Sequence, residues 1–402
     1  MSEATVAPTA SAGSIRSRWT GVVKRIGVPP ALIRYALLLF IVSRIGFIAL
    51  TFGAIQFLHP IGGGANSFLD AWVRYDATLY ARLARDGYQS SPFYRAAFFP
   101  LQPLATAIVA PLTGGNWYIA GIVVSNVAYF FALLGLGMLA LHEDSSADDD
   151  QRVADARRAM LYLTVYPMAL FLFAGYAESL FLALATWCLV AIRRGAWWQA
   201  GALGLLAAMT RQMGLFLAVP FAYDYARQAG WRLRSVRINA AWVLLIPGGL
   251  LLFMGWLWYT RGDPLAFQHA ENYWDHVFSP PWATFPWAWR LLLHERNTLF
   301  LYKDVVDLVA VLLFAGLIVV GARRLRLGDT AYSAAVWLLA LSYPAMGWPL
   351  QSDARYMLAA FPCFLTLARL GRRRWLHALI AIVFGVVLVL VTQYFVRGAL
   401  FL

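Results

Sequence analysis

The sequence predicts an all-α polytopic membrane protein. Of its 402 residues, 61% are hydrophobic and only 13% are charged, whereas roughly a quarter of the residues in soluble domains are charged. A chain with so few polar side chains cannot cover a soluble globule. Because backbone groups in lipid must be hydrogen-bonded within their own segment, we expect the apolar runs to form helices.

The charge and the cysteines exclude other classes. A net charge of +13 would suggest nucleic-acid binding in a soluble domain, but here the arginines fall in short loops between apolar runs. That distribution is typical of membrane topology, and we expect no nucleic-acid partner. Cys188 and Cys363 both lie inside apolar runs, so the sequence contains neither a disulfide framework nor the C-x-x-C spacing of a metal site.

The chain begins with a segment that we expect to lie outside the membrane domain. Residues 1–30 are rich in Ser, Ala and Thr, include several basic residues and contain no apolar core of signal-peptide length, which predicts a disordered, uncleaved cytoplasmic tail. Residues 31–402 then form a single transmembrane domain. The first span is about Ala31–Phe57, and its basic flank places the N-terminus in the cytoplasm, so residues 58–116 form a first outer loop.

One apolar segment in that loop is not expected to cross the membrane. Phe98–Leu112 contains Pro100, Pro103 and Pro111 and, at about fifteen residues, is short for a crossing of roughly twenty. We expect a re-entrant or surface-lying helix. The remaining predicted spans are Trp117–Leu141, Ala159–Gly175, Ser179–Ile192, Trp197–Thr210, Gly214–Tyr225, Ala241–Tyr259, Leu299–Val320, Ala331–Pro349, Met357–Leu370 and Trp375–Val396. With the first span they make about eleven crossings, and residues 260–298 form a second large outer loop.

The positions of the basic residues support this path. Most of the 33 Lys and Arg residues fall in the tail and in the predicted inner loops, as the positive-inside rule requires. A crossing at Phe98–Leu112 would move those loops outside. The loop His142–Arg158 is also expected inside, because its acidic run contributes little to orientation. The enriched inner positions are Arg193, Arg194, Arg227, Arg232, Arg234, Arg237, Arg323, Arg324, Arg326, Arg372, Arg373 and Arg374.

This topology brings scattered polar residues to the outer ends of hairpins. Charges near the membrane cost a few kcal/mol each unless they are paired or functional, so we expect them to enclose a polar cavity. They come from the first loop and from the motifs AGYAES, MTRQMG and QSDARY: Asp70, Asp76, Tyr176, Glu178, Thr210, Arg211, Ser352, Asp353 and Arg355.

The first loop resembles that of PIG-V-type mannosyltransferases. Their pattern is roughly W-D-A-x-x-Y-x-x-I-A-x-x-G-Y followed by A-F-F-P-L-Y-P; here Tyr75 replaces the Trp, Leu83 the Ile and Gln102 the Tyr between the prolines. Further fragments match in the same order over about residues 31–398: Ser43-Arg44, Gly121 with Ser125-Asn126, Pro167 with Tyr176–Phe181, Ala207–Gly214, Ser352–Pro362 and Phe395–Gly398.

The resemblance implies a GT-C-type integral-membrane glycosyltransferase in the plasma membrane. It would transfer a sugar, most simply mannose, from a polyprenyl-phosphate donor to a hydroxyl of a glycolipid, glycan or protein on the outer face, with inversion and without a metal or other cofactor. Asp76 matches the family's general base. The expected donor phosphate ligands are Arg211, Arg355 and Arg44, and the expected acceptor or sugar ligands are Asp70, Tyr80, Tyr176, Glu178, Glu271, His276 and Tyr356.

Structural interpretations remain open for the same residues. Asp76 begins the segment DATLYARLARDG and is also a good helix N-cap. Arg211 is equally suited to an ion pair with Glu178, and Arg355 to one with Asp353. Arg44, near the middle of the first span, is more typical of a buried structural cation bound by an acid or a carbonyl.

The second outer loop is dense in aromatic residues. Its tryptophans are typical of membrane-interface anchors, although they would also suit stacking on sugar rings or lining an entry for a polyprenyl tail. They are Trp274, Trp282, Trp287 and Trp289. The acidic and histidine residues of this loop do not show metal-ligand spacing; they are His269, Glu271, Asp275 and His276.

Three other functions remain as alternatives. A related enzyme would use another lipid-linked hexose or pentose. A secondary transporter would also have many spans, but such proteins usually show repeated halves, which this sequence lacks. A non-catalytic scaffold would tolerate the loss of Asp76 or Arg211, whereas an enzyme would not.

Overall fold

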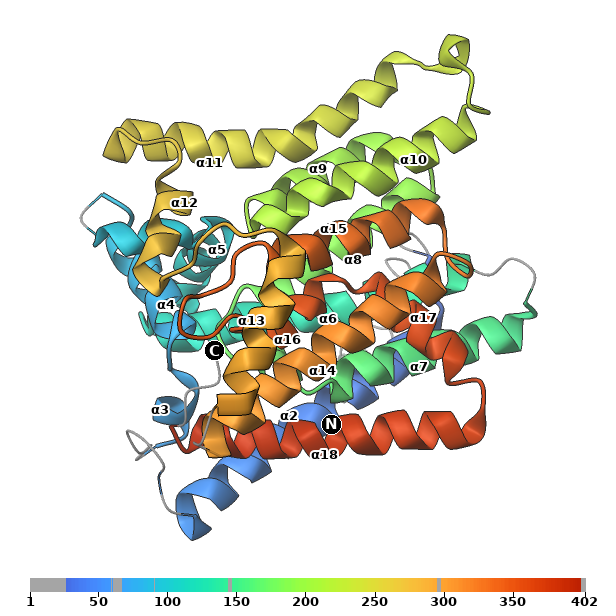
Figure 1. Cartoon of the computed structure of the whole chain (residues 1–402). Coiled ribbons are helices and arrows are strands. Elements are labelled where there is room, and N and C mark those ends of the chain that lie inside the picture. Colours follow the sequence, from blue (N-terminus) through green and yellow to red (C-terminus); the bar gives the residue numbers. More distant parts are fainter. Residues whose placement is uncertain are drawn as a thin grey trace, which may run out of the picture.

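The computed structural model is a bundle of helices with hardly any extended structure. It describes residues 27–58, 60, 67–89, 91–143, 147–294 and 298–398, so most of the expected N-terminal tail lies outside the described residues. Within these ranges the only β-type pairing is an isolated bridge between His276 and Ala345. The long helices run in a common direction, and short helices gather at one end of the bundle (Figure 1). The fold confirms the all-α class.

The elements follow one another with short connections. The α-helices are α2 (Pro30–Phe57), α3 (Phe68–Trp72), α4 (Asp76–Asp86), α5 (Leu101–Val109), α6 (Trp117–Glu143), α7 (Asp149–Val165), α8 (Glu178–Arg193), α9 (Trp197–Ala208), α10 (Ala218–Gln228), α11 (Leu245–Arg261), α12 (Ala266–His269), α13 (Pro281–His294), α14 (Thr298–Gly321), α15 (Leu327–Leu341), α16 (Asp353–Tyr356), α17 (Pro362–Leu370) and α18 (Arg374–Val396). The 3₁₀ turns are η1 (Phe93–Ala97), η2 (Ala110–Thr113), η3 (Ala169–Leu172), η4 (Gln212–Leu217), η5 (Leu233–Ser235), η6 (Ile238–Leu244), η7 (Ala270–Trp274) and η8 (Met357–Ala359).

The helices divide into long, lipid-suited ones and short, enclosed ones. Five segments are long and apolar enough to cross a membrane by themselves: Pro30–Phe57, Trp117–Glu143, Ile238–Arg261, Tyr302–Gly321 and Arg374–Val396. Four of them expose apolar side chains over much of their length, which lipid can cover without cost. Shorter helices such as α8 are almost wholly buried. The protein is therefore a multi-pass membrane protein, and the number of about eleven crossings stays a prediction.

The predicted span Ala159–Gly175 is wrong in its limits. Helix α7 begins ten residues earlier, at Asp149, where the Asp148 side chain accepts a hydrogen bond from the Gln151 N–H at 2.7 Å. It ends at Val165 because Pro167 disfavours helical geometry in the residue before it, and Tyr166 is accordingly extended. The acidic run that was expected in a loop therefore forms a capped first helical turn, where negative charge is favourable.

The predicted span Ala331–Pro349 ends too late. Helix α15 stops at Leu341, and the following chain pairs with the segment after η7 instead. Val277 N–H donates to the Pro344 carbonyl at 3.1 Å, and Met346 N–H donates to the Asp275 carbonyl at 3.1 Å. The two prolines of the segment, Pro344 and Pro349, cannot donate in a helix, which explains the early end.

The segment Phe98–Leu112 is a short helix, as its prolines indicate. Helix α5 begins directly after Pro100 and passes into the turn η2. Together they are too short to count among the candidate spans. Helix α5 packs against α4 and α6 and lies with α3, α4 and α12 at the left end of the bundle in Figure 1. We call this the α4 end.

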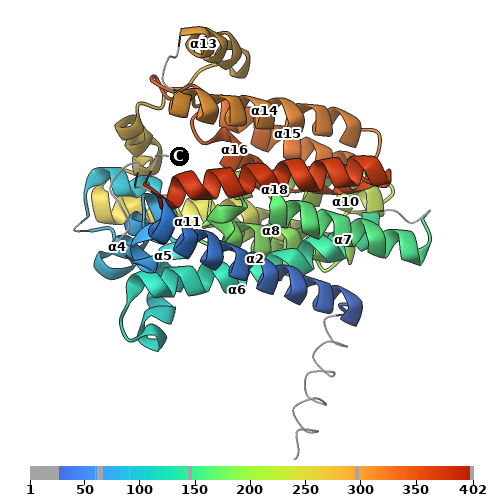
Figure 2. The same ribbon diagram turned by 90° about the horizontal axis from the view of Figure 1, so that it is seen from below.

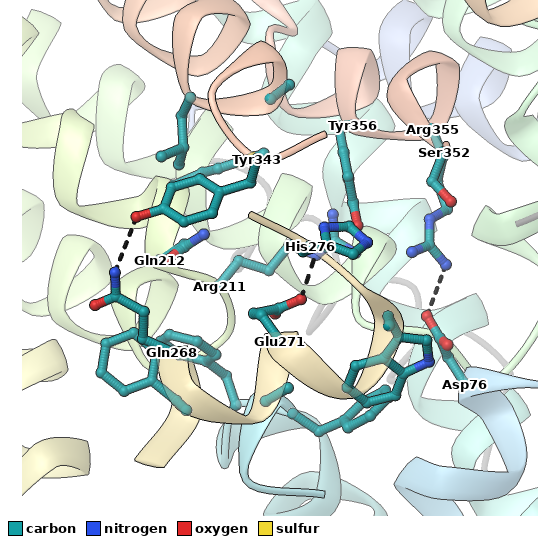
Figure 3. Close-up of a pocket in the computed structure, with 18 of the residues that line it drawn as sticks. Asp76, Arg211, Gln212, Gln268, Glu271, His276, Tyr343, Ser352, Arg355 and Tyr356 are labelled. Atoms are coloured by element: carbon teal, nitrogen blue, oxygen red, sulfur yellow. Dashed lines mark hydrogen bonds and ion pairs between the residues drawn. The ribbon is translucent and has the colours of Figure 1, made fainter. Parts of the chain in front are cut away.

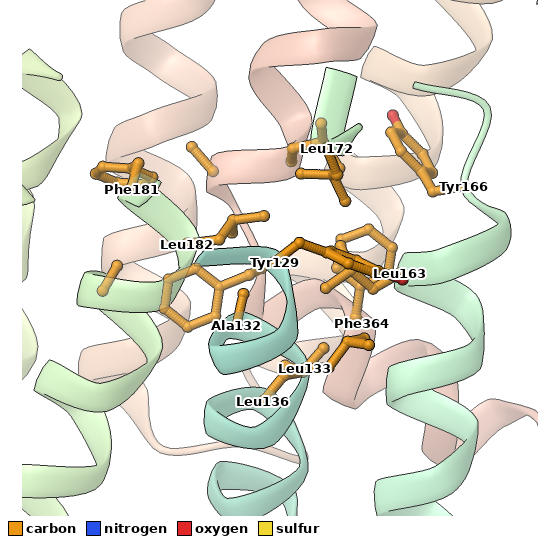
Figure 4. Close-up of a cluster of buried hydrophobic side chains, with 14 of the residues drawn as sticks. Tyr129, Ala132, Leu133, Leu136, Leu163, Tyr166, Leu172, Phe181, Leu182 and Phe364 are labelled. Carbon is orange, nitrogen blue, oxygen red and sulfur yellow. The ribbon is translucent and has the colours of Figure 1, made fainter. Parts of the chain in front are cut away.

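The centre of the bundle is a packed apolar core. Tyr129, Leu163, Phe181 and Phe364 from α6, α7, α8 and α17 meet there, all at most 1% exposed (Figure 4). The Tyr129 hydroxyl pairs with the Thr164 hydroxyl at 2.8 Å, so the buried polar atom is satisfied.

A buried ion network holds the end of the bundle opposite α4. In Figure 2, which shows the whole molecule from below, this end lies at the right. Arg193, the last residue of α8, binds Glu143 of α6, Asp224 of α10 and Asp329 of α15, and all four side chains are at most 2% exposed. Glu178 is the first residue of the same helix, about 22 Å away at 1.5 Å per residue. The network therefore fixes the helices whose other ends reach the α4 end.

Candidate active site

An open cavity of about 170 Å³ lies at the α4 end. Its walls come from α4, the segment before α5, the turn from α9 to η4, the segment from α12 to His276, and the connection from α15 to α16 (Figure 3). Segments far apart in the sequence thus contribute to one site, as the hairpin-end hypothesis predicted. The expected residues that line it are Asp76, Tyr80, Thr210, Arg211, Glu271, His276, Ser352, Arg355 and Tyr356.

Asp76 faces this cavity from the start of α4. It is the first helical residue and not the N-cap; the cap position belongs to Tyr75, and no side chain caps the helix. The N-cap interpretation of Asp76 is therefore wrong. Its carboxylate instead accepts a bond from Arg355, with Oδ2 and Nη1 2.7 Å apart. Gly87, with φ 71°, ends the helix as expected.

Four charged side chains form one network at the cavity. Besides binding Asp76, Arg355 places its Nε 3.4 Å from Glu178 Oε1, and Arg211 Nη2 lies 2.6 Å from the same oxygen. We call Asp76, Glu178, Arg211 and Arg355 the charge network. The ion pair expected between Arg211 and Glu178 is present. The pair expected between Arg355 and Asp353 is replaced by the contact with Asp76.

The hairpins that carry the arginines are held by specific backbone contacts. The Ala354 N–H donates to Asp307 Oδ1 of α14, and the Ala354 carbonyl accepts from the Tyr166 hydroxyl, each at 2.8 Å. These bonds fix the chain beside Arg355. On the other hairpin, a Cβ added at Gly214 would meet the Ala208 backbone at 2.4 Å, so only glycine permits the tight turn that follows Arg211.

The opposite wall carries mostly neutral hydrogen-bonding groups. Gln268 donates to the Tyr343 hydroxyl at 2.9 Å, and His276 Nδ1 lies 4.0 Å from Glu271 Oε2. Enclosure in the cavity raises the pKa of Glu271 to about 7, and the negative charge of Asp76 adds to the effect. Burial lowers the pKa of His276. Near neutral pH His276 is therefore uncharged, and Glu271 is only partly ionised.

Aromatic rings underlie the arginines. The Tyr356 ring centre lies 5.6 Å from the Arg211 guanidinium carbon and 5.3 Å from that of Arg355, within cation–π range. Tyr176, fully buried, packs 5.6 Å from Arg355, and its hydroxyl donates to the Arg74 carbonyl. Tyr80 lines the cavity directly. Tyr176 thus supports Arg355 from behind the wall and does not line the cavity.

Two expected site residues lie elsewhere. Arg44 is inside the bundle, where Asn126 Oδ1 at 2.7 Å, the Leu172 carbonyl at 2.8 Å and the Tyr129 ring at 4.0 Å surround its guanidinium. The structural interpretation of Arg44 holds, and its assignment as a phosphate ligand is wrong. Asp70 lies in the first turn of α3 with its N–H bound to Ser67 Oγ, and it does not line the cavity.

Several lining residues were not anticipated. They are mainly neutral: Phe98, Phe99, Gln212, Met213, Phe267, Gln268 and Tyr343. The only sequence signal for any of them was membership of a quoted motif: Gln212 and Met213 lie in MTRQMG, and Phe98 and Phe99 lie in the A-F-F-P fragment. Neutral residues in loops carry no signal of their own. Of the loop tryptophans, Trp274 lines the cavity, whereas Trp282 and Trp289 are 74% and 59% exposed, as suits interface anchors.

The structure shows no candidate metal centre within the residues it describes, since no group of three or more His, Cys, Asp or Glu side chains is arranged to hold a metal ion. His269 pairs with Asp263 at 2.8 Å instead. The ionisable groups at the cavity include the two carboxylates and two guanidinium groups of the charge network and the carboxyl group of Glu271.

Sequence comparison supports the family resemblance. The chain is 32% identical over 173 residues to GPI alpha-1,6-mannosyltransferase 2 of Mus musculus, covering 39% of this chain and 33% of that protein. It is 34% identical over 160 residues to GPI mannosyltransferase 2 of Yarrowia lipolytica, covering 40% and 42%. The match thus spans a third to two fifths of these relatives. No family model matches the chain.

Two solved structures are similar over most of the chain. ArnT from Cupriavidus metallidurans, bound to undecaprenyl phosphate, has a TM-score of 0.47 and 14% identity, covering 83% of this chain and 60% of that one. The Archaeoglobus fulgidus oligosaccharyltransferase has a TM-score of 0.45 and 12% identity, covering 90% and 53%.

Proposed function

We propose that this multi-pass membrane protein is a GT-C-type glycosyltransferase that transfers mannose from a polyprenyl-phosphate donor to an acceptor hydroxyl. The observation that carries the proposal is the charge network: a carboxylate and two arginines line one large cavity, and a second carboxylate ties the arginines together. The similarity to mannosyltransferases named above supports the choice of sugar.

Inverting transfer requires the two kinds of group that the network supplies. The acceptor oxygen attacks C1 of the sugar, its proton passes to a base, and the C1–O bond to the phosphate breaks with its electron pair left on the phosphate oxygen. Asp76 is the carboxylate of the charge network that lines the cavity, and we assign it as the base. Arg211 and Arg355 hold the phosphate, because planar multi-donor groups suit phosphate oxygens.

Donor binding would also release the base. In the structure, Arg355 is engaged by Asp76. An incoming phosphate competes for the same guanidinium, which frees the Asp76 carboxylate to accept a hydrogen bond from the acceptor hydroxyl. Donor arrival and base activation are therefore coupled through one side chain.

The neutral wall suits a polyol. Glu271, His276, Gln268 and Tyr343 present donors and acceptors across the cavity from Asp76, and hydroxyl-rich ligands are recognised by such groups. We assign Glu271 and His276, with Tyr80 and Tyr356, to the acceptor or the transferred sugar. A glycolipid, a glycan or a protein side chain satisfies this chemistry as acceptor.

The cavity is proposed to face the outer side of the membrane. The arginine-rich connections after α8, α10, α14 and α17 follow the helix ends opposite to those that carry Glu178, Arg211 and Arg355. If these connections are cytoplasmic, as the positive-inside rule favours, the cavity opens away from the cytoplasm. A lipid-linked donor suits that side, where nucleotide sugars are not available.

The main departures from the PIG-V pattern do not alter the walls of the cavity. Neither Tyr75 nor Gln102 lines it. Gln102 is fully buried against Ser125, with Nε2 and Oγ 3.4 Å apart, and Tyr75 packs near Phe395. These substitutions therefore give no reason to prefer another hexose or a pentose over mannose.

A direct transfer assay tests the proposal. Purified protein would be incubated with a membrane-lipid extract and with radiolabelled polyprenyl-phosphate mannose, glucose or a pentose in parallel. We expect label from the mannose donor alone to enter a new product, and Asp76→Asn protein to give almost none. Transfer of another sugar would replace mannose in the proposal. Donor binding without any transfer would instead indicate a scaffold.

A further inference from the structure

A buried lysine lies behind the charge network. Lys303, in the second turn of α14, is 4% exposed, and among the described residues its Nζ has no hydrogen-bond partner. The indole of Trp348 lies over it, with the Nζ 5.2 Å from the ring centre. An ammonium group that is buried without hydrogen bonds is costly, so its position calls for an explanation.

The residue type is unusual for this chain. Of the 33 basic residues, only Lys24 and Lys303 are lysines, and Lys24 lies outside the described residues. An ammonium is a compact charge on a flexible stem with three rotatable donors, whereas a guanidinium has a fixed planar fork. Lys303 is thus the one lysine among the described residues, and its ammonium can follow a ligand whose charge and position change.

A second, smaller cavity connects Lys303 with Arg355. It has room for no more than about one water molecule and is lined by Lys303, Asp307, Ser352, Arg355 and three apolar side chains. Ser352 and Arg355 also line the main cavity. The two cavities therefore share a wall, and Lys303 and Arg355 face the same small space.

The charges of the main cavity balance only before a donor binds. Asp76 and Glu178 match Arg211 and Arg355. The phosphodiester of a lipid-linked sugar adds one negative charge. When the C1–O bond breaks, the electron pair stays on the phosphate, which becomes a monoester carrying up to two negative charges near neutral pH. The charge network contains no further cation for the charge that appears in this step.

We propose that Lys303 is the third cation of the donor site and stabilises the second negative charge of the departing lipid phosphate. This inference rests on the proposed function. Arg211 and Arg355 bind the phosphodiester, and the Lys303 ammonium acts from the small cavity behind Arg355 as the leaving oxygen gains charge. The neighbouring carboxylate of Asp307 accepts the Ala354 N–H through Oδ1 and also attracts the Lys303 ammonium, so it holds the Arg355 hairpin in place and keeps the ammonium beside the small cavity.

Two lipids that differ by one charge test the role. Undecaprenyl phosphate is largely a dianion at pH 8, and its monomethyl ester is a monoanion with the same tail. Affinities of both for wild-type, Lys303→Met and Lys303→Arg proteins would be measured at pH 8 and pH 5.5. Met is an unbranched apolar side chain one atom shorter than lysine and carries no charge, and Arg keeps the charge.

We expect Lys303→Met to weaken binding of undecaprenyl phosphate at pH 8 by about tenfold or more, the scale of one charge-assisted hydrogen bond, and to change binding of the monomethyl ester little. At pH 5.5, where the phosphate is mostly a monoanion, the difference should shrink. Lys303→Arg should restore much of the preference. An equal loss for both lipids, or no loss for either, would overturn the inference. Wild-type protein that bound neither lipid would instead contradict the proposed function.

Discussion

Replacing Asp76 by Asn removes the proposed base while changing little else. The two side chains have the same shape, and the new amide would still offer an oxygen to Arg355, whose Nη1 now lies 2.7 Å from the carboxylate. The bond would keep its charged donor but lose its charged acceptor, and would therefore weaken within the range of about 0.5–3 kcal/mol that neutral and charged hydrogen bonds span. We therefore expect a loss of about 1 kcal/mol in stability and a folded protein.

Turnover should respond far more strongly. An amide cannot accept the acceptor proton, so the rate should fall by about 10²–10⁴-fold, the usual contribution of general-base catalysis. Donor affinity should be unchanged or higher, because Arg355 would no longer be held by a competing anion. Asp76→Glu should also be slow, since one added methylene displaces the carboxylate by about 1 Å and the rate depends on positioning.

The assay separates these effects. Single-turnover transfer from radiolabelled polyprenyl-phosphate mannose measures the chemical step, and binding of the same donor measures the site. Wild-type turnover in a folded Asp76→Asn protein would exclude Asp76 as the base. The structure then points to Glu271, the other carboxyl that lines the cavity, because neither Asp70 nor Glu178 lines it.

Three further results are expected. Arg211→Ala should weaken donor binding by about 1.5–3 kcal/mol, and Arg211→Lys should recover only part of it because a point charge cannot reproduce the fork; unchanged affinity in Arg211→Ala would leave the phosphate to Arg355. The pKa of Glu271 is raised to about 7, so its carboxyl is neutral below that pH and repels an anionic donor above it. Donor affinity should therefore fall as the pH rises through about 7 in the wild type and not in Glu271→Gln. The same fall in both proteins would refute the assignment of this pKa to Glu271. Single cysteines would be introduced in a background without native cysteines. An impermeant thiol reagent should reach those at positions 86 and 275 from outside the cell, and those at positions 148 and 234 only after permeabilisation. Labelling of 86 and 148 from the same side would make Phe98–Leu112 a crossing.

The hairpin ends that meet at the α4 end were predictable because simple hydrophobic patterns in the sequence mark them. Long apolar runs located α2, α6 and α18 to within a few residues. The interruptions between shorter runs then located Glu178, Arg211 and Arg355. Charged residues at such interruptions must be paired or functional, so the sequence indicated that they would share a site even before any contact between them was known.

The pairing of these charges was less predictable. Asp353 is two residues before Arg355, and side chains at that spacing do not face each other on a helix. The structure sets Arg355 against Asp76, 279 residues away in the chain, a choice that depends on how the hairpins pack. The role proposed for Lys303 was not predictable for another reason. Lys303 lies at the start of the segment Tyr302–Gly321, which as a whole has the composition of an ordinary membrane span.

The strain at Tyr75 links the fold to the chemistry. Tyr75 has φ 49° and ψ −122°, a conformation that glycine adopts readily and that costs another residue of order 1–3 kcal/mol. Its ring packs near Phe395, with ring centres 6.0 Å apart. The next residue begins α4 with its carboxylate on Arg355. The turn thus directs Asp76 into the cavity, and contacts on both sides of Tyr75 hold the unfavourable backbone. A glycine there would relieve the strain but would lose the ring that fixes the turn. The position of the proposed base, Asp76, therefore depends on an aromatic residue at a site where the backbone conformation by itself favours glycine.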